Sequence, residues 1–435
     1  MRNNGTRKRG AVSGLLISSL ALILFGAALF PLSKRLAGWF FFRVQDEKEL
    51  LSAIRYDSGN AAYHYLLGKY HHMNLNSPDI PKAIESYRNS LRLNPIHSGV
   101  WIDLSKAYQI NNQKEEAEHA LERAVRLSPN NPDLLWEAGT FWLMNSMPDK
   151  AVKALRQYLI LAPQMQPIVY DLCWKLRLEN SFIIENVVPP AYEYQAGYLT
   201  YLISTKRVSE ALYAWRAIDL TKLEKKVFIS YSNFLIENGV YESAETVWTD
   251  ITAKIEGLNG RDANTLLWNH DFEAEPLNGG FDWRIAETEG VNAFIDDTVK
   301  MTGNRSLGVA FDGLHNPDIT IAQQTVIITP GASYSLRGYI KAEGITTKNG
   351  IFLQVQGHRC TGLDARTESV AGSSFWREVT VDFEAPPSCS AAVVKIRRER
   401  SQKLDNKIEG TAWIDGITLK RQAALQTNSS KKHTT

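Results

Sequence analysis

The residues that could carry out chemistry in this chain are scattered, and they match no catalytic motif. The 435 residues contain no glycine-rich phosphate-binding loop, no nucleophile elbow and no helical zinc-protease motif. His71 and His72 are adjacent in a helical pattern, so their rings point in different directions. Glu115 and Glu116 fall in a charged helical segment, which is typical of a solvated face. The sequence therefore predicts a binding protein and not an enzyme.

The charge balance also bears on the class of partner. Lysine and arginine number 49 against 47 aspartate and glutamate residues. A nucleic-acid-binding protein would favour a basic face, so we expect no nucleic-acid partner.

Three prolines at a constant interval indicate internal repeats. Pro95, Pro129 and Pro163 are 34 residues apart, and each closes an amphipathic helical segment. Proline fits there because it cannot continue a helix. The middle repeat combines aromatic, leucine and alanine positions at Trp101, Leu104, Tyr108, Ala117, Leu121 and Ala124. This pattern resembles the tetratricopeptide repeat, which implies an all-α solenoid over residues 45–256, with the best repeats at 60–163.

Degenerate copies are expected C-terminal to the three repeats that match the pattern well. Residues 166–190 contain one clear helical pattern, from Ile168 to Leu178, and are interpreted as a distorted repeat. Two further first helices are expected at about 192–204 and 226–238, each followed by a second helix that carries Trp215 or Trp248.

The repeat resemblance implies a groove that binds a protein partner. In tetratricopeptide repeats this groove is lined by first-helix residues outside the packing signature. The matching positions are Tyr65, Lys69, His72, Ile102, Lys106, Gln109, Trp136, Thr140 and Leu143. Tyr65 and Trp136 would supply aromatic anchors for a peptide or a helix. The alternative is that both rings pack on neighbouring repeats.

Helical periodicity stops near residue 256, and short alternating segments between turn residues take over. This pattern indicates a β-sandwich over residues 262–422. Strands are expected at 319–328, 333–342, 351–355, 376–383, 391–397 and 411–419. Several of its segments, in their order along the chain, resemble a galactose-binding-like jelly roll of the kind found in carbohydrate-binding modules: Leu267–Glu273, Gly303–Leu307, Pro330–Tyr334, Trp376–Val379 and Trp413–Ile417.

The jelly-roll resemblance implies two possible ligands. A structural calcium ion would be held by Glu273 and Asp415 with Asp271 nearby, and backbone carbonyls would complete its shell. The alternative is a hydrogen-bonded carboxylate pair without metal, and no other cofactor is required. A sugar would contact Trp283, Tyr339, His358 and Arg359, whereas Trp376 and Trp413 are expected in the core.

The three cysteines are too few for a disulfide framework. Cys360 and Cys389 both fall in the predicted sandwich, and an extracytoplasmic location would permit a disulfide between them. Cys173 lies in an apolar helix and is expected to be a buried free thiol.

The N-terminal segment predicts a membrane anchor. No charged residue lies between Gly10 and Ser33, and about 20 apolar residues span the bilayer core, so a transmembrane helix is expected at 11–33. The alternative, a cleaved signal peptide, has a shorter apolar core of about 7–15 residues. More basic residues precede the span than follow it, which favours residues 1–10 in the cytoplasm. In a bacterium the domains would then lie in the periplasm. The polar tail 423–435 is expected to be disordered.

The expected architecture is thus multidomain, with a transmembrane helix, an all-α solenoid and an all-β jelly-roll sandwich. The leading hypothesis is a scaffold anchored in the bacterial inner membrane that recruits a protein, and domain analogy alone suggests a role in envelope polysaccharide assembly or export. An alternative is a carbohydrate-binding protein whose repeats are a spacer. A polysaccharide-cleaving enzyme would need paired carboxylates about 5–10 Å apart in a cleft.

Overall fold

The computed structural model describes residues 33–37, 46–74, 77–253, 261–404 and 406–422. The predicted N-terminus 1–10, the predicted transmembrane helix 11–33 apart from its last residue, and the tail 423–435 lie outside this part of the chain. Among the described residues, no helix combines the length and the apolar character that crossing a membrane requires. The chain divides into two compact units between Tyr198 and Leu199.

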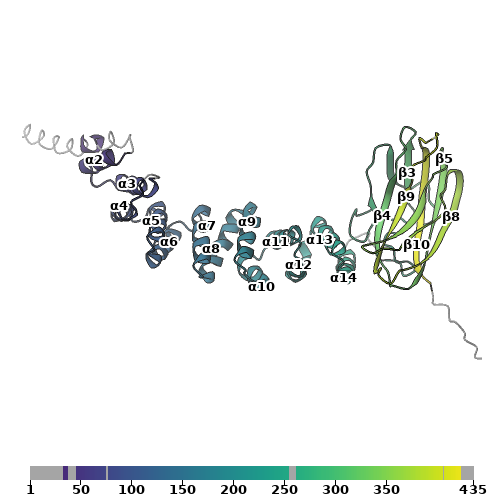
Figure 1. Ribbon diagram of the computed structural model, residues 1–435, viewed down its shortest axis with the longest axis horizontal. Coiled ribbons are helices and arrows are strands. Elements are labelled where there is room, and N and C mark those ends of the chain that lie inside the picture. Colours follow the sequence, from purple (N-terminus) through teal and green to yellow (C-terminus); the bar gives the residue numbers. More distant parts are fainter. Residues whose placement is uncertain (1–32, 38–45, 75–76, 254–260, 405, 423–435) are drawn as a thin grey trace, which may run out of the picture. The chain divides into compact units, whose positions relative to one another are not determined.

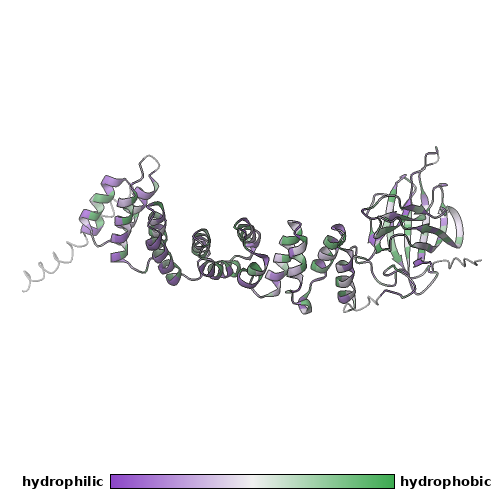
Figure 2. Ribbon diagram, turned by 60° about the horizontal axis from the view of Figure 1, so that its bottom comes forward, coloured by the Kyte–Doolittle hydropathy of each residue, from purple (hydrophilic) through white to green (hydrophobic). Residues whose placement is uncertain are grey.

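The first unit consists of paired helices, as the 34-residue interval predicts (Figure 1). In chain order up to residue 161, its helices are α2 Glu47–Tyr56, α3 Ala61–Met73, α4 Ile80–Leu93, α5 Ser98–Ile110, α6 Lys114–Leu127, α7 Pro132–Met144 and α8 Pro148–Leu161. Helix α3 packs on α4, α5 on α6 and α7 on α8. In Figure 2 these helices carry both hydrophobic and hydrophilic residues, as amphipathic helices do.

Small residues set the close packing within each pair. A Cβ atom at Gly68 would overlap the Tyr87 ring, and one at Gly139 would overlap Leu155. Ala117 of α6, the helix that packs on α5, is fully buried. The turns between paired helices reverse through a left-handed residue at Asn112 and again 34 residues later at Ser146. The recurring interval in the sequence is therefore a recurring packing unit.

The predicted distorted repeat is present. Helix α9 (Gln166–Lys175) follows the 3₁₀ turn η1 (Pro163–Met165), and the short helix α10 (Asn180–Phe182) continues into the π-helical turn η2 (Ile183–Val187). Cys173 is a buried free thiol, as predicted. The later helices are α11 Tyr192–Ser204, α12 Val208–Trp215, α13 Lys225–Glu237 and α14 Tyr241–Thr252, with the 3₁₀ turn η3 Leu220–Lys222 between α12 and α13.

The second unit contains a sandwich of two five-stranded antiparallel sheets, which confirms the all-β prediction (Figure 1). One sheet has the order β1-β4-β9-β6-β7 and the other the order β2-β3-β10-β5-β8. The strands are β1 Arg284–Ile285, β2 Val291–Asp296, β3 Ser306–Asp312, β4 Ile319–Ile327, β5 Ser333–Ile345, β6 Phe352–Gly357, β7 Asp364–Arg366, β8 Gly372–Glu384, β9 Ala391–Arg398 and β10 Glu409–Arg421. Alternate residues of the inner strands, such as Ile396 and Ile414, fill the core.

The last helix pair packs on the sandwich within this second unit. Trp248 of α14 is fully buried, stacks on Phe228 of α13 with ring centroids 4.9 Å apart, and meets Trp268 and Phe281 edge-on. The side-chain oxygen of Asn233 accepts hydrogen bonds from the Gly280 backbone and from Arg284. The compact unit thus begins about 60 residues before the domain boundary expected near 256–262, because these contacts join the last helices to the strands.

Candidate binding surfaces

The predicted groove residues occupy one helix of each of the first three pairs. Tyr65, Lys69 and His72 lie on α3, the next three on α5 and the last three on α7. Eight of the nine side chains are partly exposed, whereas Leu143 is only 9% exposed and packs in the core. Leu143 is therefore removed from the candidate surface, because its side chain is buried. The first helix of each pair is called its A helix, and we call the other eight residues the A-helix surface.

Tyr65 is both partly exposed and tied to the next repeat. Its hydroxyl donates a hydrogen bond to Oδ2 of Asp103 on α5, at 2.8 Å. Burial, together with this carboxylate, raises the pKa of Tyr65 above its ordinary value, so the hydroxyl stays a donor at neutral pH. The ammonium of Lys69 lies 5.6 Å from the centre of the Tyr65 ring. The ring is thus fixed in place at the surface.

The same kind of link recurs between the second and third repeats. Nζ of Lys106 on α5 lies 3.2 Å from Oε2 of Glu137 on α7. Trp136 packs against Tyr158 of α8, with ring centroids 5.4 Å apart. Tyr65 thus contacts the next repeat, whereas Trp136 packs on the second helix of its own repeat. Both rings keep an exposed part, and their contact with a partner stays a prediction.

His72 completes this surface as a neutral residue. Its Nδ1 lies 3.1 Å from the Tyr87 hydroxyl. Burial lowers the pKa of His72, and Lys106 lowers it further, while Asp103 opposes the shift. The A-helix surface can therefore offer aromatic faces, an apolar side chain at Ile102 and fixed polar groups, which is the chemistry of peptide recognition.

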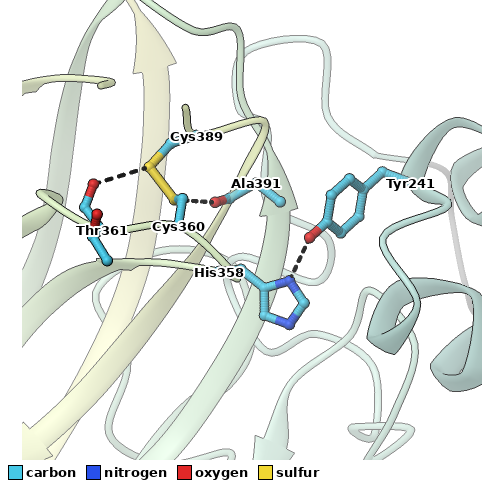
Figure 3. The surroundings of a disulfide bond; sticks show 6 residues. All are labelled: Tyr241, His358, Cys360, Thr361, Cys389 and Ala391. Carbon is cyan, nitrogen blue, oxygen red and sulfur yellow. Dashed lines mark hydrogen bonds between the residues drawn. A yellow bond between two sulfur atoms is a disulfide. The ribbon is translucent and has the colours of Figure 1, made fainter. Parts of the chain in front are cut away.

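The predicted disulfide is present in the sandwich (Figure 3). The Sγ atoms of Cys360 and Cys389 are 2.06 Å apart. His358 and Arg359, which were predicted to contact sugar, directly precede Cys360 in the chain. Instead, Nδ1 of His358 lies 2.8 Å from the Tyr241 hydroxyl of α14, and Arg359 donates to the Glu237 backbone carbonyl of α13. These two side chains attach the last helix pair to the sandwich.

The other predicted sugar contacts divide between the core and the surface. Trp283 is 0% exposed, stacks on Phe272 and donates to the Asn269 carbonyl, so its prediction as a sugar contact is wrong. Tyr339 on β5 is half-buried and remains available. Trp376, expected in the core, is only half-buried. Trp413 is buried, 8% exposed, as expected, although it lies outside the cluster that includes its strand neighbours Ala412 and Ile414. It is covered by the ammonium of Lys341, 4.8 Å from its ring centre.

One exposed aromatic residue escaped the sequence analysis. Phe375 on β8 is 92% exposed and lies where the β5–β8 register shifts, next to the Ala342–Ser374 pair. The alternation of the sequence drew attention to its neighbour Trp376. The register shift had no signal in the sequence pattern, so the exposed ring could not be assigned.

The predicted calcium ligands bind one loop from two sides. The carboxylate oxygens of Asp415 accept hydrogen bonds from the backbone of Met301, Thr302 and Gly416 and from the Thr302 hydroxyl. Those of Glu273 accept from the backbone of Asn304 and Arg305 and from the Asn304 amide.

In this arrangement both carboxylates are engaged in hydrogen bonds to residues 301–305. N–H donors face all four oxygens of Asp415 and Glu273, where a cation would need free lone pairs. Asp271 pairs with its neighbour His270 at 3.3 Å. Nowhere in the described ranges do three or more His, Cys, Asp or Glu side chains form a group that could hold a metal ion.

Comparison with known proteins supports the repeats. Residues 102–165, which run from within α5 through α8 to the turn that follows, match a tetratricopeptide repeat family model. The TPR repeat-containing protein YpiA of Bacillus subtilis (strain 168) is 24% identical over 197 residues, which are 43% of this chain. The match covers 46% of YpiA, so the chain spans about half the length of this curated relative. The chain thus contains tetratricopeptide repeats followed by a two-sheet sandwich.

Similar solved structures include both repeat proteins and carbohydrate-binding modules. MamA is 17% identical, with a TM-score of 0.27 and coverage of 38% of this chain and 97% of that chain. The CBM22-1 xylan-binding domain from Paenibacillus barcinonensis Xyn10C is 13% identical, with a TM-score of 0.26 and coverage of 36% and 94%. TmCBM61, solved in complex with β-1,4-galactotriose, is 16% identical, with a TM-score of 0.25 and coverage of 37% and 100%.

Proposed function

We propose that this chain is a scaffold that binds a protein partner through its A-helix surface. The observation that carries the proposal is the fixed, partly exposed set of side chains on α3, α5 and α7. The hydrogen bond between Tyr65 and Asp103 and the ion pair between Lys106 and Glu137 hold the groups in place before binding. A preorganised surface loses less side-chain entropy when a partner docks. Aromatic rings at Tyr65 and Trp136, with Ile102 between them in the sequence, suit a segment with spaced apolar side chains.

Paired alanine variants test this proposal in the full-length chain. Tyr65→Ala with Trp136→Ala should reduce the amount of partner that co-purifies at least tenfold, which corresponds to about 1.4 kcal/mol. Met73→Ala with Met144→Ala is the matched control, because these exposed apolar residues lie on the same two helices outside the A-helix surface. Equal capture by both double variants would contradict the proposal.

The proposed location is outside the cytoplasm of a bacterium, with residues 11–33 as the membrane anchor and a role in envelope polysaccharide assembly or export. Support comes from the uncharged segment between Gly10 and Ser33 and from the Cys360–Cys389 bond, since disulfides persist in oxidising compartments. A reporter fused after Thr435 should be active only outside the cytoplasm. Activity only in the cytoplasm would rule out this location, while the protein-binding role would stand.

Glycan binding by the sandwich is a second candidate function. It is favoured by the exposed ring of Phe375 and the half-buried ring of Tyr339, which lie on the paired strands β8 and β5. Glu378 lies opposite Tyr339 across the two strands, and an aromatic face with such a polar neighbour suits a sugar ring. Phe375→Ala should abolish binding on a glycan array if this function is real. A wild-type chain that binds no glycan on the array would exclude it.

A further inference from the structure

A second surface of the repeats carries a cluster of arginine side chains, which the A-helix surface lacks. A pocket of about 740 Å³ lies among α4, α5 and α6, and it shares no residue with the A-helix surface. This volume is in the range of ligand sites in proteins. Four arginines line it, two from each second helix of the first two repeats: Arg88 and Arg92 on α4, Arg123 and Arg126 on α6. We call it the basic pocket.

The positive charge of the basic pocket is only partly compensated, because Glu122, which interacts with Arg126, also pairs with Lys150. Glu116 is the one carboxylate among its lining residues. Within the described part of the chain, none of the four guanidinium groups forms an ion pair, although Arg92 donates to the Asn89 amide and Arg88 to the Tyr108 hydroxyl. Arg88 and Arg92 are four residues apart on one helix, a spacing at which like charges destabilise the helix. An anionic ligand would relieve this repulsion.

The floor of the pocket is apolar and rigid. Leu91 and Leu104 are buried beneath it. The indole of Trp101 is held by a hydrogen bond from Nε1 to the Pro95 carbonyl, at 2.9 Å. Tyr108 is held by the guanidinium of Arg88, which lies 5.7 Å from its ring centre. An apolar side chain can therefore be buried between charges that bind at the rim.

We propose that the basic pocket binds an acidic polypeptide segment with an apolar side chain between its carboxylates. The arginine fork pairs with a carboxylate through two parallel hydrogen bonds, which a lysine ammonium cannot do. The apolar floor favours such a segment over a sulfated polysaccharide or a free phosphate, because neither has an aliphatic group to bury there. Because this pocket shares no residue with the A-helix surface, the repeats would bind two segments at once.

Peptide titration of the full-length chain tests the proposal. The probe is a synthetic peptide with the repeat Glu-Glu-Leu, and its glutamine counterpart shows whether charge is needed. Arg88→Gln with Arg123→Gln should weaken binding of the acidic peptide at least tenfold. Arg55→Gln with Lys114→Gln removes the same charge from exposed positions outside the pocket and should change binding less than twofold. Circular dichroism confirms that each variant is folded.

Further variants and competitors separate the sources of negative charge. Arg88→Lys with Arg123→Lys keeps the charge but loses the fork, so binding should fall between the wild type and the glutamine variant. Trp101→Ala should weaken the acidic peptide more than it weakens heparin or tripolyphosphate. The proposal is overturned if the acidic peptide does not bind the wild-type chain, or if the chain with Arg88→Gln and Arg123→Gln binds it equally well. It is also overturned if heparin binds and the acidic peptide cannot displace it.

Discussion

The helix pairs at the start and at the end of the repeat region use the same architecture in opposite ways. In the first three pairs, α3, α5 and α7 keep aromatic and polar side chains partly exposed and fix them with links between repeats. In the last pair, Trp248 of α14 is buried between Phe228 of α13 and the sandwich segment. The comparison teaches that a repeat surface is available for a partner only where no other part of the same chain covers it.

The reason for the difference lies in the physics of stacked repeats. Each repeat buries its apolar face against its neighbours, so the end of an array needs a cover. Here Phe281 and Trp268 of the sandwich segment supply the cover for Trp248. The sandwich therefore has a structural role for the repeats as well as any role in binding.

The largest expected effect comes from the buried ring of the last pair. Trp248→Ala should lower the free energy of unfolding of the second unit by about 3–5 kcal/mol, because it leaves a cavity among packed aromatic rings. Chemical denaturation of the full-length chain measures this loss. Met144→Ala, which truncates a 75% exposed side chain in the first unit, should have almost no effect. A small loss for Trp248→Ala would mean that the sandwich does not cover the last pair.

A glycine contact tests the same interface by overpacking. Gly280 has φ +59°, and a Cβ atom there would overlap the Trp248 ring. Gly331 has φ +72° and open space around it, so Gly331→Ala carries the backbone strain alone. Gly280→Ala should therefore be the more destabilising of the two variants, by about 1–3 kcal/mol in chemical denaturation. Equal effects would show that Trp248 is free to move away.

The attachment of the last pair should weaken in acid. Burial lowers the pKa of His358 below its ordinary value, and Arg359 and Arg284 add to the shift, whereas Glu237 opposes it. The folded state then binds this proton less readily than the unfolded chain, so the stabilising contribution is present above about pH 6.5 and is lost as the pH falls below it.

The melting temperature of the second unit, followed from pH 7.5 down to 5.5, measures this effect. His358→Asn keeps a polar atom near the position of Nδ1 and cannot take up the proton, so it should flatten the pH dependence. An unchanged slope in this variant would assign the pH dependence to other groups.

The smallest effect is expected in the first repeats. Tyr65→Phe removes the hydrogen bond to Asp103 and keeps the ring, so it should cost about 0.5–1.5 kcal/mol of stability in the first unit. Partner binding through the ring should be nearly retained, in contrast to Tyr65→Ala. If Tyr65→Phe abolishes partner binding, the hydroxyl and not the ring makes the contact.

The sequence predicted the features that recur and missed those that depend on contacts between distant segments. The interval from Pro95 to Pro163 and the alanine at 117 reflect packing within one repeat, so the helix pairs were predictable. The alternation of β9 and β10 likewise reflects one buried face. Trp283 was misassigned because an indole that fills a core and one that stacks on a sugar have the same sequence signal. The hydrogen bond between Tyr241 and His358 joins residues 117 positions apart in the sequence, so no local pattern predicts it.

The central claim is that the A-helix surface contacts a protein partner, and site-specific photocrosslinking in living cells tests it most directly. A photoreactive amino acid placed at Ile102 lies within this surface, whereas one at Glu85 lies at an exposed position of α4 outside it. The account predicts a discrete crosslinked protein from position 102, lost when Tyr65→Ala and Trp136→Ala are added, and none of that size from position 85. The same adduct from both positions, or none from position 102, would contradict the account.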